Sequence, residues 1–453
     1  MNLRLSDVAT WTRGKILGQD VALTGLSADT RTIQPGNLFV ALLGEHHDAH
    51  AFVGQALANG AVAAMVSRRV DVAIPQVVVA DTLLALGDLA GAVRAPQHVR
   101  VVGITGSNGK TTVKTLVASI LTRHGRTHVN AGNFNNEIGL PLTLLAMPAD
   151  SEYAVIEMGA GKLGDIAYLA EIARPEIGLV NNVASAHLER MGSLSGVAET
   201  KGALYSALPH DGVAVINADD AFADYFSGLA GARRTLRFGL EFAADVTAED
   251  IVLGTESRFT LVAPQGRMDV VLPLTGRHNV MNALAAASIA CALDVPLATI
   301  KTGLEQAEHV KGRLVRHDLP GGWSVIDDSY NANPGSTAAA IAALTLEAGE
   351  AWLVLGDMKE LGPAAERLHG EIGALAKRSG IARLYTVGPL ARKASEFFGP
   401  GAKAFTDQTA LISALMADLK PGVRCLIKGS RSSAMDRVVS ALLPSGGGDA
   451  HAA

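Results

Sequence analysis

The segment from Thr105 to Thr112 combines glycines with a lysine and several hydroxyl side chains, a composition that suits phosphate binding. Glycines let the backbone approach phosphate oxygens, and the unpaired N–H groups at a helix N-terminus attract anions. Lys110 would neutralise the β and γ phosphates, and Thr111 would offer its hydroxyl to magnesium. The strict G-x-x-x-x-G-K-T pattern is not met, because Ile104 stands where its first glycine would be. The segment predicts a nucleoside triphosphate site; it reads Thr105, Gly106, Ser107, Asn108, Gly109, Lys110, Thr111, Thr112.

Two further candidate ligands follow predicted strands. Glu157 ends the apolar run that starts at Tyr153, and His187 follows the run from Ile177 to Val180 by a few residues. Apolar runs without alternation are typical of parallel strands that are buried on both faces. Open α/β sheets build their sites at the carboxyl ends of such strands. We therefore expect Glu157 and His187 to lie beside the glycine segment, where Glu157 would hold a metal ion and His187 would contact magnesium or phosphate.

Each of these residues also has a purely structural interpretation. The glycine segment could be a turn that caps a helix, Glu157 could be solvated, and a lone histidine is usually structural. Lys201 lies in a predicted helix, where a solvated lysine is the common case. Asn279 and Asn282 lie about one helical turn apart and could face one ligand, or they could be a polar helix start.

Strand and helix patterns alternate along the chain, which predicts an α/β protein. A chain of 453 residues exceeds one ordinary core, since domains of roughly 100 to 200 residues are the norm. Residues 1–97 predict a small N-terminal α/β domain, and residues 98–311 predict a P-loop domain with a mostly parallel sheet. Four strand-like runs between residues 234 and 275 predict a small antiparallel subsheet within it. Residues 312–453 predict a Rossmann-like, doubly wound domain.

The composition excludes several classes of protein. Hydrophobic residues make up 48% and charged residues 18%, which predicts large cores. The formal charge of -5 argues against a nucleic-acid binder. Neither a signal peptide nor a membrane span is predicted, because the first residues are charged and the apolar stretch 283–300 contains Asp294 and Pro296. We expect a cytoplasmic monomer that is not inserted into a membrane.

The glycine segment, Glu157, His187 and Asn279 follow one another along the chain in an order that resembles the Mur ligases of peptidoglycan synthesis. The resemblance runs from about residue 24 to residue 440 and also includes Arg313 and the segment Asp327-Asp-Ser-Tyr-Asn-Ala-Asn-Pro334. Within the family, the chain is similar to the branch that adds D-alanyl-D-alanine to UDP-N-acetylmuramoyl-tripeptide. Three segments indicate that branch: Ala131-Gly-Asn-Phe-Asn-Asn-Glu-Ile-Gly-Leu-Pro141, Leu355-Gly-Asp-Met-Lys-Glu-Leu-Gly362 and Lys428-Gly-Ser-Arg431.

The resemblance implies ATP and Mg²⁺ as cofactors and assigns roles to individual residues. It implies that magnesium is held by Thr111, Glu157, His187 and a carbamylated Lys201. Apart from the glycine segment, the implied ATP contacts are Asn279, Asn282, Arg313, Asp328, Tyr330 and Asn331. The implied catalytic residues are Lys110, Glu157, His187, Lys201 and Arg313.

The resemblance also implies substrate contacts in all three domains. The implied nucleotide-sugar contacts in the N-terminal domain are Ser27, Asp29, Thr30, Arg31, Asp48, His50 and Phe52. In the central domain the implied substrate contacts are Asn135 and Asn136. In the C-terminal domain the implied substrate contacts are Asp357, Lys428, Ser430 and Arg431.

The implied reaction is an amide ligation through an acyl phosphate. The terminal carboxylate of the tripeptide would attack the γ-phosphate, and the amine of the dipeptide would then displace phosphate. One alternative is a sister ligase, either a folylpolyglutamate synthase or a ligase that adds another amino acid, and the substrate segments before residue 100 argue against the folate ligase. Another is a nucleotide switch, but the chain has no Asn-Lys-x-Asp guanine signature, and Glu157, His187 and Arg313 would then lack a purpose.

Overall fold

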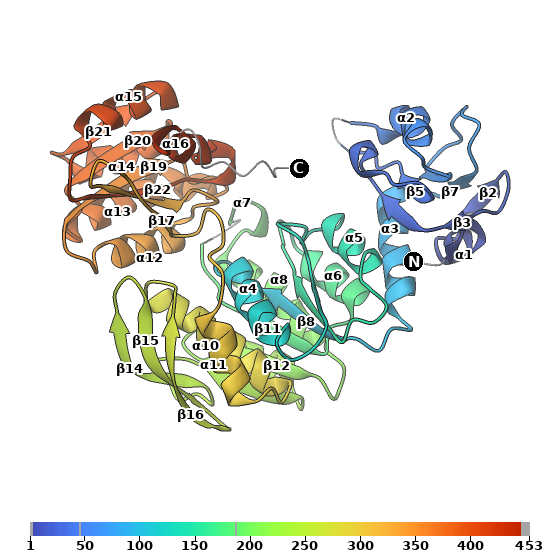
Figure 1. The fold of residues 1–453 in the computed structure, drawn as a ribbon, viewed down its shortest axis with the longest axis horizontal. Coiled ribbons are helices and arrows are strands. Elements are labelled where there is room, and N and C mark those ends of the chain that lie inside the picture. The colour runs from blue at the N-terminus through green and yellow to red at the C-terminus, as the bar shows by residue number, and fades with distance from the viewer. Residues whose placement is uncertain (1–2, 45–46, 186–187, 445–453) are drawn as a thin grey trace.

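The computed structural model describes residues 3–44, 47–185 and 188–444, and these form three α/β units. Figure 1 shows the N-terminal unit, in blue, and the C-terminal unit, in orange to red, on opposite sides of the central unit. The α/β class and the three-unit organisation predicted from the sequence are therefore confirmed. The boundaries at residues 97/98 and 311/312 stay predictions. No helix within the described ranges is long and apolar enough to cross a membrane.

The N-terminal unit contains a five-stranded sheet in the order β2-β7-β6-β5-β4, in which only β2 runs antiparallel to its neighbour. The strands β1 and β3 pair as a small antiparallel ribbon. The elements are β1 (Leu3–Arg4), α1 (Leu5–Trp11), β2 (Lys15–Leu17), β3 (Ala22–Leu23), β4 (Gly25–Ser27), η1 (Thr30–Thr32), β5 (Asn37–Val40), η2 (Ala49–Phe52), α2 (Val53–Ala58), β6 (Ala63–Val66), β7 (Gln76–Val78) and α3 (Thr82–Arg94).

The central unit is built on a six-stranded parallel sheet in the order β13-β12-β11-β8-β10-β9. The strand β8, which leads into the glycine segment, lies between β11 and β10, so that the three strand ends meet at one edge. The elements are β8 (Arg100–Thr105), α4 (Lys110–Leu121), β9 (Thr127–Val129), α5 (Gly139–Leu145), β10 (Tyr153–Glu157), α6 (Asp165–Ala173), β11 (Ile177–Val180), α7 (Leu188–Met191), α8 (Leu194–Ser206), β12 (Val213–Asn217), α9 (Ala223–Ala230) and β13 (Arg234–Phe238).

A three-stranded antiparallel sheet extends the central unit, as the sequence predicts, but it uses one strand fewer than expected. It consists of β14 (Thr247–Leu253), β15 (Ser257–Ala263) and β16 (Gly266–Leu272). The first of the four strand-like runs is β13, which pairs in parallel with β12 in the main sheet. The helices α10 (Arg277–Ala292) and α11 (Leu297–Glu305) follow. Most of α10 is buried on all sides, which explains its alanine-rich sequence.

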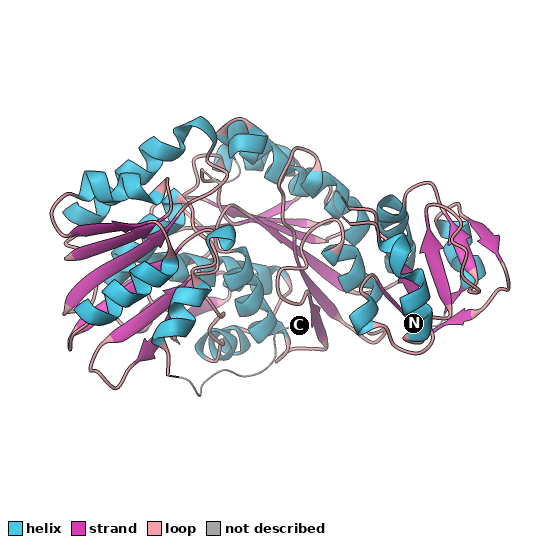
Figure 2. Ribbon diagram, turned by 90° about the horizontal axis from the view of Figure 1, so that it is seen from above, coloured by secondary structure: helices cyan, strands magenta, loops and turns pink. Residues whose placement is uncertain are grey.

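The C-terminal unit is a second six-stranded sheet, in the order β17-β18-β22-β19-β20-β21, and only β17 is antiparallel. Helices lie on both faces of this sheet, as Figure 2 shows. The elements are β17 (Val315–Asp318), β18 (Ser324–Asp328), α12 (Pro334–Leu344), β19 (Glu350–Gly356), η3 (Gly362–Ala364), α13 (Ala365–Arg378), β20 (Arg383–Val387), α14 (Ala391–Phe398), β21 (Ala402–Phe405), α15 (Gln408–Asp418), β22 (Val423–Lys428), η4 (Arg431–Ser433) and α16 (Asp436–Leu442).

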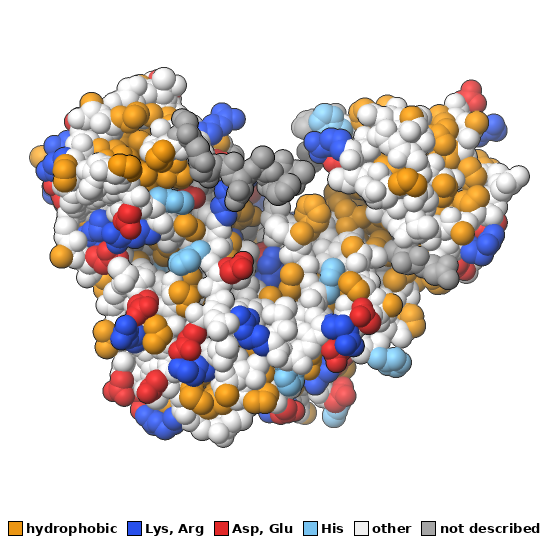
Figure 3. Space-filling view, in the orientation of Figure 1, with side chains coloured by type: hydrophobic (Ala, Val, Ile, Leu, Met, Phe, Trp, Pro, Cys, Tyr) orange, Lys and Arg blue, Asp and Glu red, His pale blue; other side chains and the backbone are white. Residues whose placement is uncertain are grey.

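The hydrophobic cores connect the three units unequally. One continuous core joins the sheet and α3 of the N-terminal unit to α5 and α6 of the central unit, with members such as Leu38, Leu86 and Leu140. The C-terminal sheet has its own cores on its two faces. Figure 3 shows the surface hollowed between the N-terminal and C-terminal units. The C-terminal unit therefore meets the rest of the molecule mainly through the polar residues of the site.

Candidate functional site

The glycine segment forms the turn between β8 and α4, as the sequence predicts. Gly109 precedes the first residue of α4 and has φ +79°, a conformation that L side chains rarely adopt. A Cβ atom at Gly109 would lie 2.4 Å from Asn282 Oδ1 and 2.5 Å from Asn181 Nδ2. Glycine is therefore required here for both its conformation and the close approach. The backbone N–H groups at the start of α4 are left for an anion.

A network of asparagine side chains holds the back of this turn. Asn181 donates through Nδ2 to Asn108 O and to Asn282 Oδ1, both at 3.0 Å. Asn182 accepts from Asn108 N at 2.8 Å and donates back to Asn108 O at 3.1 Å. Asn282 in turn donates to Asn279 Oδ1 at 3.0 Å. Asn181 and Asn182 were not among the predicted site residues, although their place directly after β11 was a usable signal.

Glu157 lies beside the start of α4, as predicted. Its carboxylate accepts hydrogen bonds from Thr111 Oγ1 at 2.9 Å and from Asn135 Nδ2 at 2.7 Å. Burial alone would raise the pKa of Glu157, but the charges of Lys110 and Lys114, with these hydrogen bonds, lower it. The ionised carboxylate and the Thr111 hydroxyl are oxygen ligands of the kind that Mg²⁺ prefers.

Lys110 reaches across the glycine turn and donates from Nζ to Gly106 O at 2.7 Å. Desolvation lowers the pKa of Lys110, and Glu157 partly opposes that shift. The ammonium group lies over the loop that would hold phosphate. Lys110 therefore occupies the position that the sequence predicts for neutralising phosphate charge.

Lys114 is a functional candidate that the sequence analysis missed. It lies one helical turn after Lys110, is only 6% exposed, and has its Nζ 3.3 Å from Glu157 Oε2. The same Nζ donates at 3.0 Å to Asn130 O and to Gly132 O. Lys114 thus ties the loop that carries Asn135 to the phosphate-binding helix. A lysine amid the apolar positions of α4 was the available signal.

We expect Lys114→Met to destabilise the protein by about 3–5 kcal/mol, because it breaks a buried ion pair and leaves two carbonyl groups without their donor. Urea unfolding, followed by circular dichroism, measures this change. The exposed Lys162→Met is the matched control and should change stability by less than about 0.5 kcal/mol. A Lys114→Met protein as stable as the control would show that the buried contacts contribute nothing.

Lys201, on α8, is 1% exposed and is among the largest fully buried side chains of the described residues. Burial, with a smaller effect of the Lys110 charge, holds its pKa well below the usual lysine value. The solvated lysine that is common on helices is therefore not what the structure contains.

His187 lies outside the described residues, and the described part of the chain has no group of three His, Cys, Asp or Glu side chains that could hold a metal.

The C-terminal unit brings Arg313 to the same place. Its Nη2 donates to Thr111 Oγ1 at 2.9 Å, and its guanidinium lies 4.5 Å from the ring centroid of Tyr330. Its Nε is buried without a hydrogen-bond partner, which leaves one donor for a bound group. Arg313 therefore connects the two units at the predicted phosphate site.

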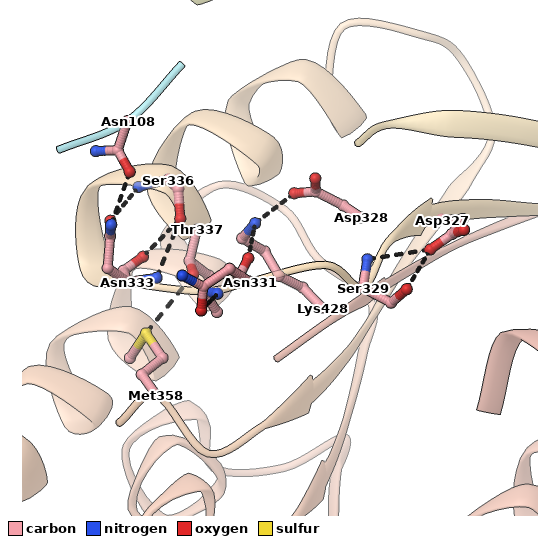
Figure 4. Close-up of polar contacts among 11 residues, drawn as sticks. Asn108, Asp327, Asp328, Ser329, Asn331, Asn333, Ser336, Thr337, Met358 and Lys428 are labelled. Atoms are coloured by element: carbon pink, nitrogen blue, oxygen red, sulfur yellow. Dashed lines mark hydrogen bonds and ion pairs between the residues drawn. The ribbon is translucent and has the colours of Figure 1, made fainter. Parts of the chain in front are cut away.

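A second contact between these units is drawn in Figure 4. Asn333 Nδ2 donates to Asn108 Oδ1 at 2.7 Å, and Asn333 also caps the first turn of α12. Lys428, from the neighbouring strand β22, donates to Asp328 Oδ2 at 2.5 Å and to Asn331 O at 2.9 Å. The predicted ATP contacts of the C-terminal unit thus lie together, on the side that faces the glycine turn.

A cavity of about 830 Å³ lies between the central and C-terminal units. It contains most of the predicted ATP contacts and both predicted substrate amides of the central domain. The predicted residues that line it are Ser107, Asn108, Gly109, Lys110, Thr112, Asn135, Asn136, Glu157, Asn279, Asn282, Arg313, Asp328, Tyr330, Asn331 and Lys428.

Other predicted residues lie outside this lining. Asp357 is 4% exposed, and its Oδ1 accepts from the backbone of Leu390 at 3.0 Å and of Ala391 at 2.8 Å, where α14 begins. Ser430 is also buried, whereas Arg431 is exposed. A substrate role for these three side chains stays a prediction. Thr105, Gly106, Thr111 and Lys201 likewise do not line the cavity, although Gly106 and Thr111 are hydrogen-bonded to the lining residues Lys110 and Glu157.

The predicted nucleotide-sugar residues lie in the N-terminal unit. His50 is 3% exposed; its Nδ1 lies 2.6 Å from Asp48 Oδ1, and its Nε2 accepts from Ser67 N at 2.8 Å. A second cavity, of about 610 Å³, lies between this unit and α5. Of the predicted residues, only Ser27 lines it; the others are Asp29, Thr30, Arg31, Asp48, His50 and Phe52. Their roles stay predictions.

Three family models match successive parts of the chain. The model described as Mur ligase family, catalytic domain, matches residues 22–94. The Mur ligase middle domain matches residues 104–290, and the Mur ligase, glutamate ligase domain, matches residues 312–431.

Two curated relatives that share one name match this protein over nearly its whole chain. The UDP-N-acetylmuramoyl-tripeptide--D-alanyl-D-alanine ligase of Escherichia coli is 45% identical over 98% of this chain and 99% of its own. The ligase of the same name from Bacillus subtilis is 34% identical over 94% of each chain.

Solved structures agree with these sequence matches. MurF from Acinetobacter baumannii has a TM-score of 0.92 at 35% identity and covers 98% of this chain and 99% of that one. MurF ligase from Thermotoga maritima, solved in complex with ADP, has a TM-score of 0.83 at 28% identity, covering 92% and 96%.

Proposed function

Because this chain belongs to the Mur ligase family, we propose that it is an ATP-dependent ligase that joins D-alanyl-D-alanine to UDP-N-acetylmuramoyl-tripeptide. Its product is a precursor of peptidoglycan, and ADP and phosphate are released. The observation that carries this proposal is the cavity in which Lys110 and Glu157 of one unit face Arg313 of another. Its cytoplasmic location and monomeric state stay predictions.

The first step activates a carboxylate, which is a poor electrophile at neutral pH. A terminal carboxylate oxygen of the tripeptide attacks the γ-phosphorus, the bond to the β–γ bridging oxygen breaks, and ADP leaves. Lys110 and Arg313 are fixed cations beside the transferred group, and they stabilise the charge that gathers on its oxygens. The unpartnered Nε of Arg313 supplies an additional donor.

The second step forms the amide. The amine of the dipeptide attacks the acyl carbon, the carbon–oxygen bond to the phosphoryl group breaks, and inorganic phosphate leaves. Water would compete for the acyl phosphate, so the C-terminal unit must stay docked on the glycine turn. The contacts Asn333–Asn108 and Arg313–Thr111 support this docking.

The residues around Glu157 fit a magnesium ion. We propose that the Thr111 hydroxyl, the Glu157 carboxylate and a carbamate on Lys201 hold it, since all three offer oxygen ligands. When bound, magnesium would neutralise charge on the phosphates. The predicted ligand His187 belongs to the same proposal, although it lies outside the described residues. Lys201 suits carbamylation because its lowered pKa leaves more of the amine neutral and able to react with carbon dioxide.

The proposed function predicts that phosphate release requires ATP, UDP-N-acetylmuramoyl-tripeptide and D-alanyl-D-alanine together. A phosphate-release assay with each component omitted in turn measures this requirement, and mass spectrometry identifies the pentapeptide product. A panel of other acceptors and single amino acids is the control for a sister activity. Equal turnover without D-alanyl-D-alanine would contradict the assignment. So would a preference for an acceptor that carries only two peptide residues, used together with a single amino acid.

A further inference from the structure

A side-chain amide takes the place of a missing strand beside Glu157. The strand β9 pairs with β10 as far as Val129, which lies opposite Val155, whereas β10 continues for two residues to Glu157. Beyond the end of β9, Asn130 Oδ1 accepts from Glu157 N at 3.0 Å, and Asn130 Nδ2 donates to Glu157 O at 2.9 Å. One amide group therefore bonds both the N–H and the C=O of Glu157, as a neighbouring strand would.

The same amide also holds the loop that carries Asn135. Asn130 Nδ2 donates to Phe134 O at 2.9 Å, and the backbone O of Asn130 accepts from Lys114 Nζ at 3.0 Å. Asn135, the residue after Phe134, donates through Nδ2 to Glu157 Oε1 at 2.7 Å. Asn130 thus holds the backbone of Glu157 directly, and through the loop it holds the amide that bonds the carboxylate.

Asn130 contributes to the site only through other residues. It is 1% exposed and does not line the cavity, whereas Glu157 and Asn135 do. Its side-chain oxygen and its side-chain nitrogen are both bonded to backbone groups. An apolar side chain at this position would leave the N–H and C=O of Glu157 and the C=O of Phe134 without these partners.

We propose that Asn130 is a positioning residue that orients the carboxylate of Glu157 for magnesium. This inference rests on the proposed function, in which Glu157 holds the metal. The carboxylate is bonded on both oxygens, by Asn135 on Oε1 and by Thr111 on Oε2. Asn130 fixes the backbone from which this carboxylate extends and the loop that supplies one of its two donors. A ligand that is held in place before the metal binds does not have to be ordered by the metal, so loss of Asn130 should weaken magnesium binding.

Asn130→Ala should weaken the binding of magnesium and leave the nucleotide site otherwise unchanged. Calorimetric titration with ADP, once in excess Mg²⁺ and once in EDTA, gives the factor by which Mg²⁺ tightens ADP binding. In the variant this factor should fall about 10-fold, or to one, which is the lower end of the effect of removing a residue that orients a metal ligand. The dissociation constant for ADP in EDTA should change less than about 2-fold, because Asn130 does not line the cavity.

Asn37→Ala is the matched control for the loss of a buried amide. Asn37 lies in the N-terminal unit, is 7% exposed, and accepts through Oδ1 from Gln34 N at 3.0 Å. Both variants should unfold at lower urea concentration than the wild type, but only Asn130→Ala should lower the magnesium factor. Asn130→Ser keeps one hydroxyl for the backbone groups and should lower the factor less; it replaces Asn130→Ala if that variant does not fold.

Glu157→Ala separates the positioning role from the metal site itself. It should lower the magnesium factor at least as far as Asn130→Ala does, and the double variant should show no further decrease, because Asn130 acts through Glu157. A wild-type factor in the folded Asn130 variant, or a further decrease in the double variant, would overturn the role of Asn130. If Mg²⁺ did not tighten ADP binding to the wild type, or if Glu157→Ala kept the wild-type factor, the proposed magnesium site would be contradicted instead.

Discussion

Lys110→Met is expected to lower kcat for phosphate release about 100- to 1,000-fold with all substrates saturating, the loss that follows removal of one fixed donor at a developing charge. The Lys110 ammonium lies over the glycine turn, where its Nζ is 2.7 Å from Gly106 O. When a triphosphate occupies the turn, this group can leave the carbonyl for the phosphate oxygens. A continuous phosphate-release assay measures the effect.

The control for this prediction is the stability of the variant, which shows whether it still folds like the wild type. Methionine is unbranched and only one atom shorter than lysine, and it removes the charge, so urea unfolding should be close to that of the wild type. Lys110→Arg retains a cation but has a planar, larger head group, and it should not restore the rate. If Lys110→Met raised only the KM for ATP and left kcat unchanged, Lys110 would bind the ground state and the transition state equally well.

Local pattern was enough to predict the glycine turn and the strand that precedes it. The strand β8 is buried along almost its whole length, and its apolar sequence shows this directly. The position of Glu157 could be predicted equally well, because a residue at the end of a parallel strand is placed by the topology of the sheet rather than by its sequence neighbours. The predicted pair of Asn279 and Asn282 was also found at the cavity, through the helical spacing of α10.

Residues whose role depends on tertiary contacts were not predictable in this way. Lys114 stands amid the apolar positions of α4, but only the packing of the loop with Asn130 and Gly132 shows that it is a buried cation. Asp357 shows the reverse case: its motif suggested a substrate contact, but its carboxylate also caps α14, far along the chain. The strand β13 was assigned to the subsheet because pairing partners cannot be read from a strand's own residues.

The contact between Asn108 and Asn333 explains why the cavity requires both units. Asn108 belongs to the glycine turn, whose back is held by Asn181 and Asn182, and its side chain faces the first turn of α12. A phosphate that binds in the turn would therefore contact a segment on which the C-terminal unit rests. Since the cores of that unit are separate from the others, these polar contacts set its position. We therefore expect nucleotide binding to be coupled to docking of the C-terminal unit.

Lys201→Met is expected to remove activity and yet to stabilise the unmodified protein by about 1–3 kcal/mol at pH 7 in buffer free of carbon dioxide. It removes a buried amine that has no hydrogen bond or ion pair among the described residues and that loses its favourable hydration on folding. The folded-state pKa of Lys201 lies below its unfolded value, so the folded state binds fewer protons between the two values. The loss in the free energy of unfolding that Lys201 causes therefore decreases as the pH rises toward 10.5. Urea unfolding at several pH values should show the difference between the two proteins narrowing in that direction.

The same side chain should make the wild-type enzyme depend on carbon dioxide. Carbamylation converts the neutral amine into an anion, which supplies the negative charge that Glu157 alone does not provide near Lys110 and Arg313. Exhaustive removal of carbon dioxide should lower phosphate release, and bicarbonate should restore it, whereas Lys201→Ala should stay inactive under both conditions. Full activity of Lys201→Ala, unaffected by bicarbonate, would rule out the carbamate. Greater stability together with lost activity would mean that Lys201 is retained at a cost to folding because its modified form completes the metal site.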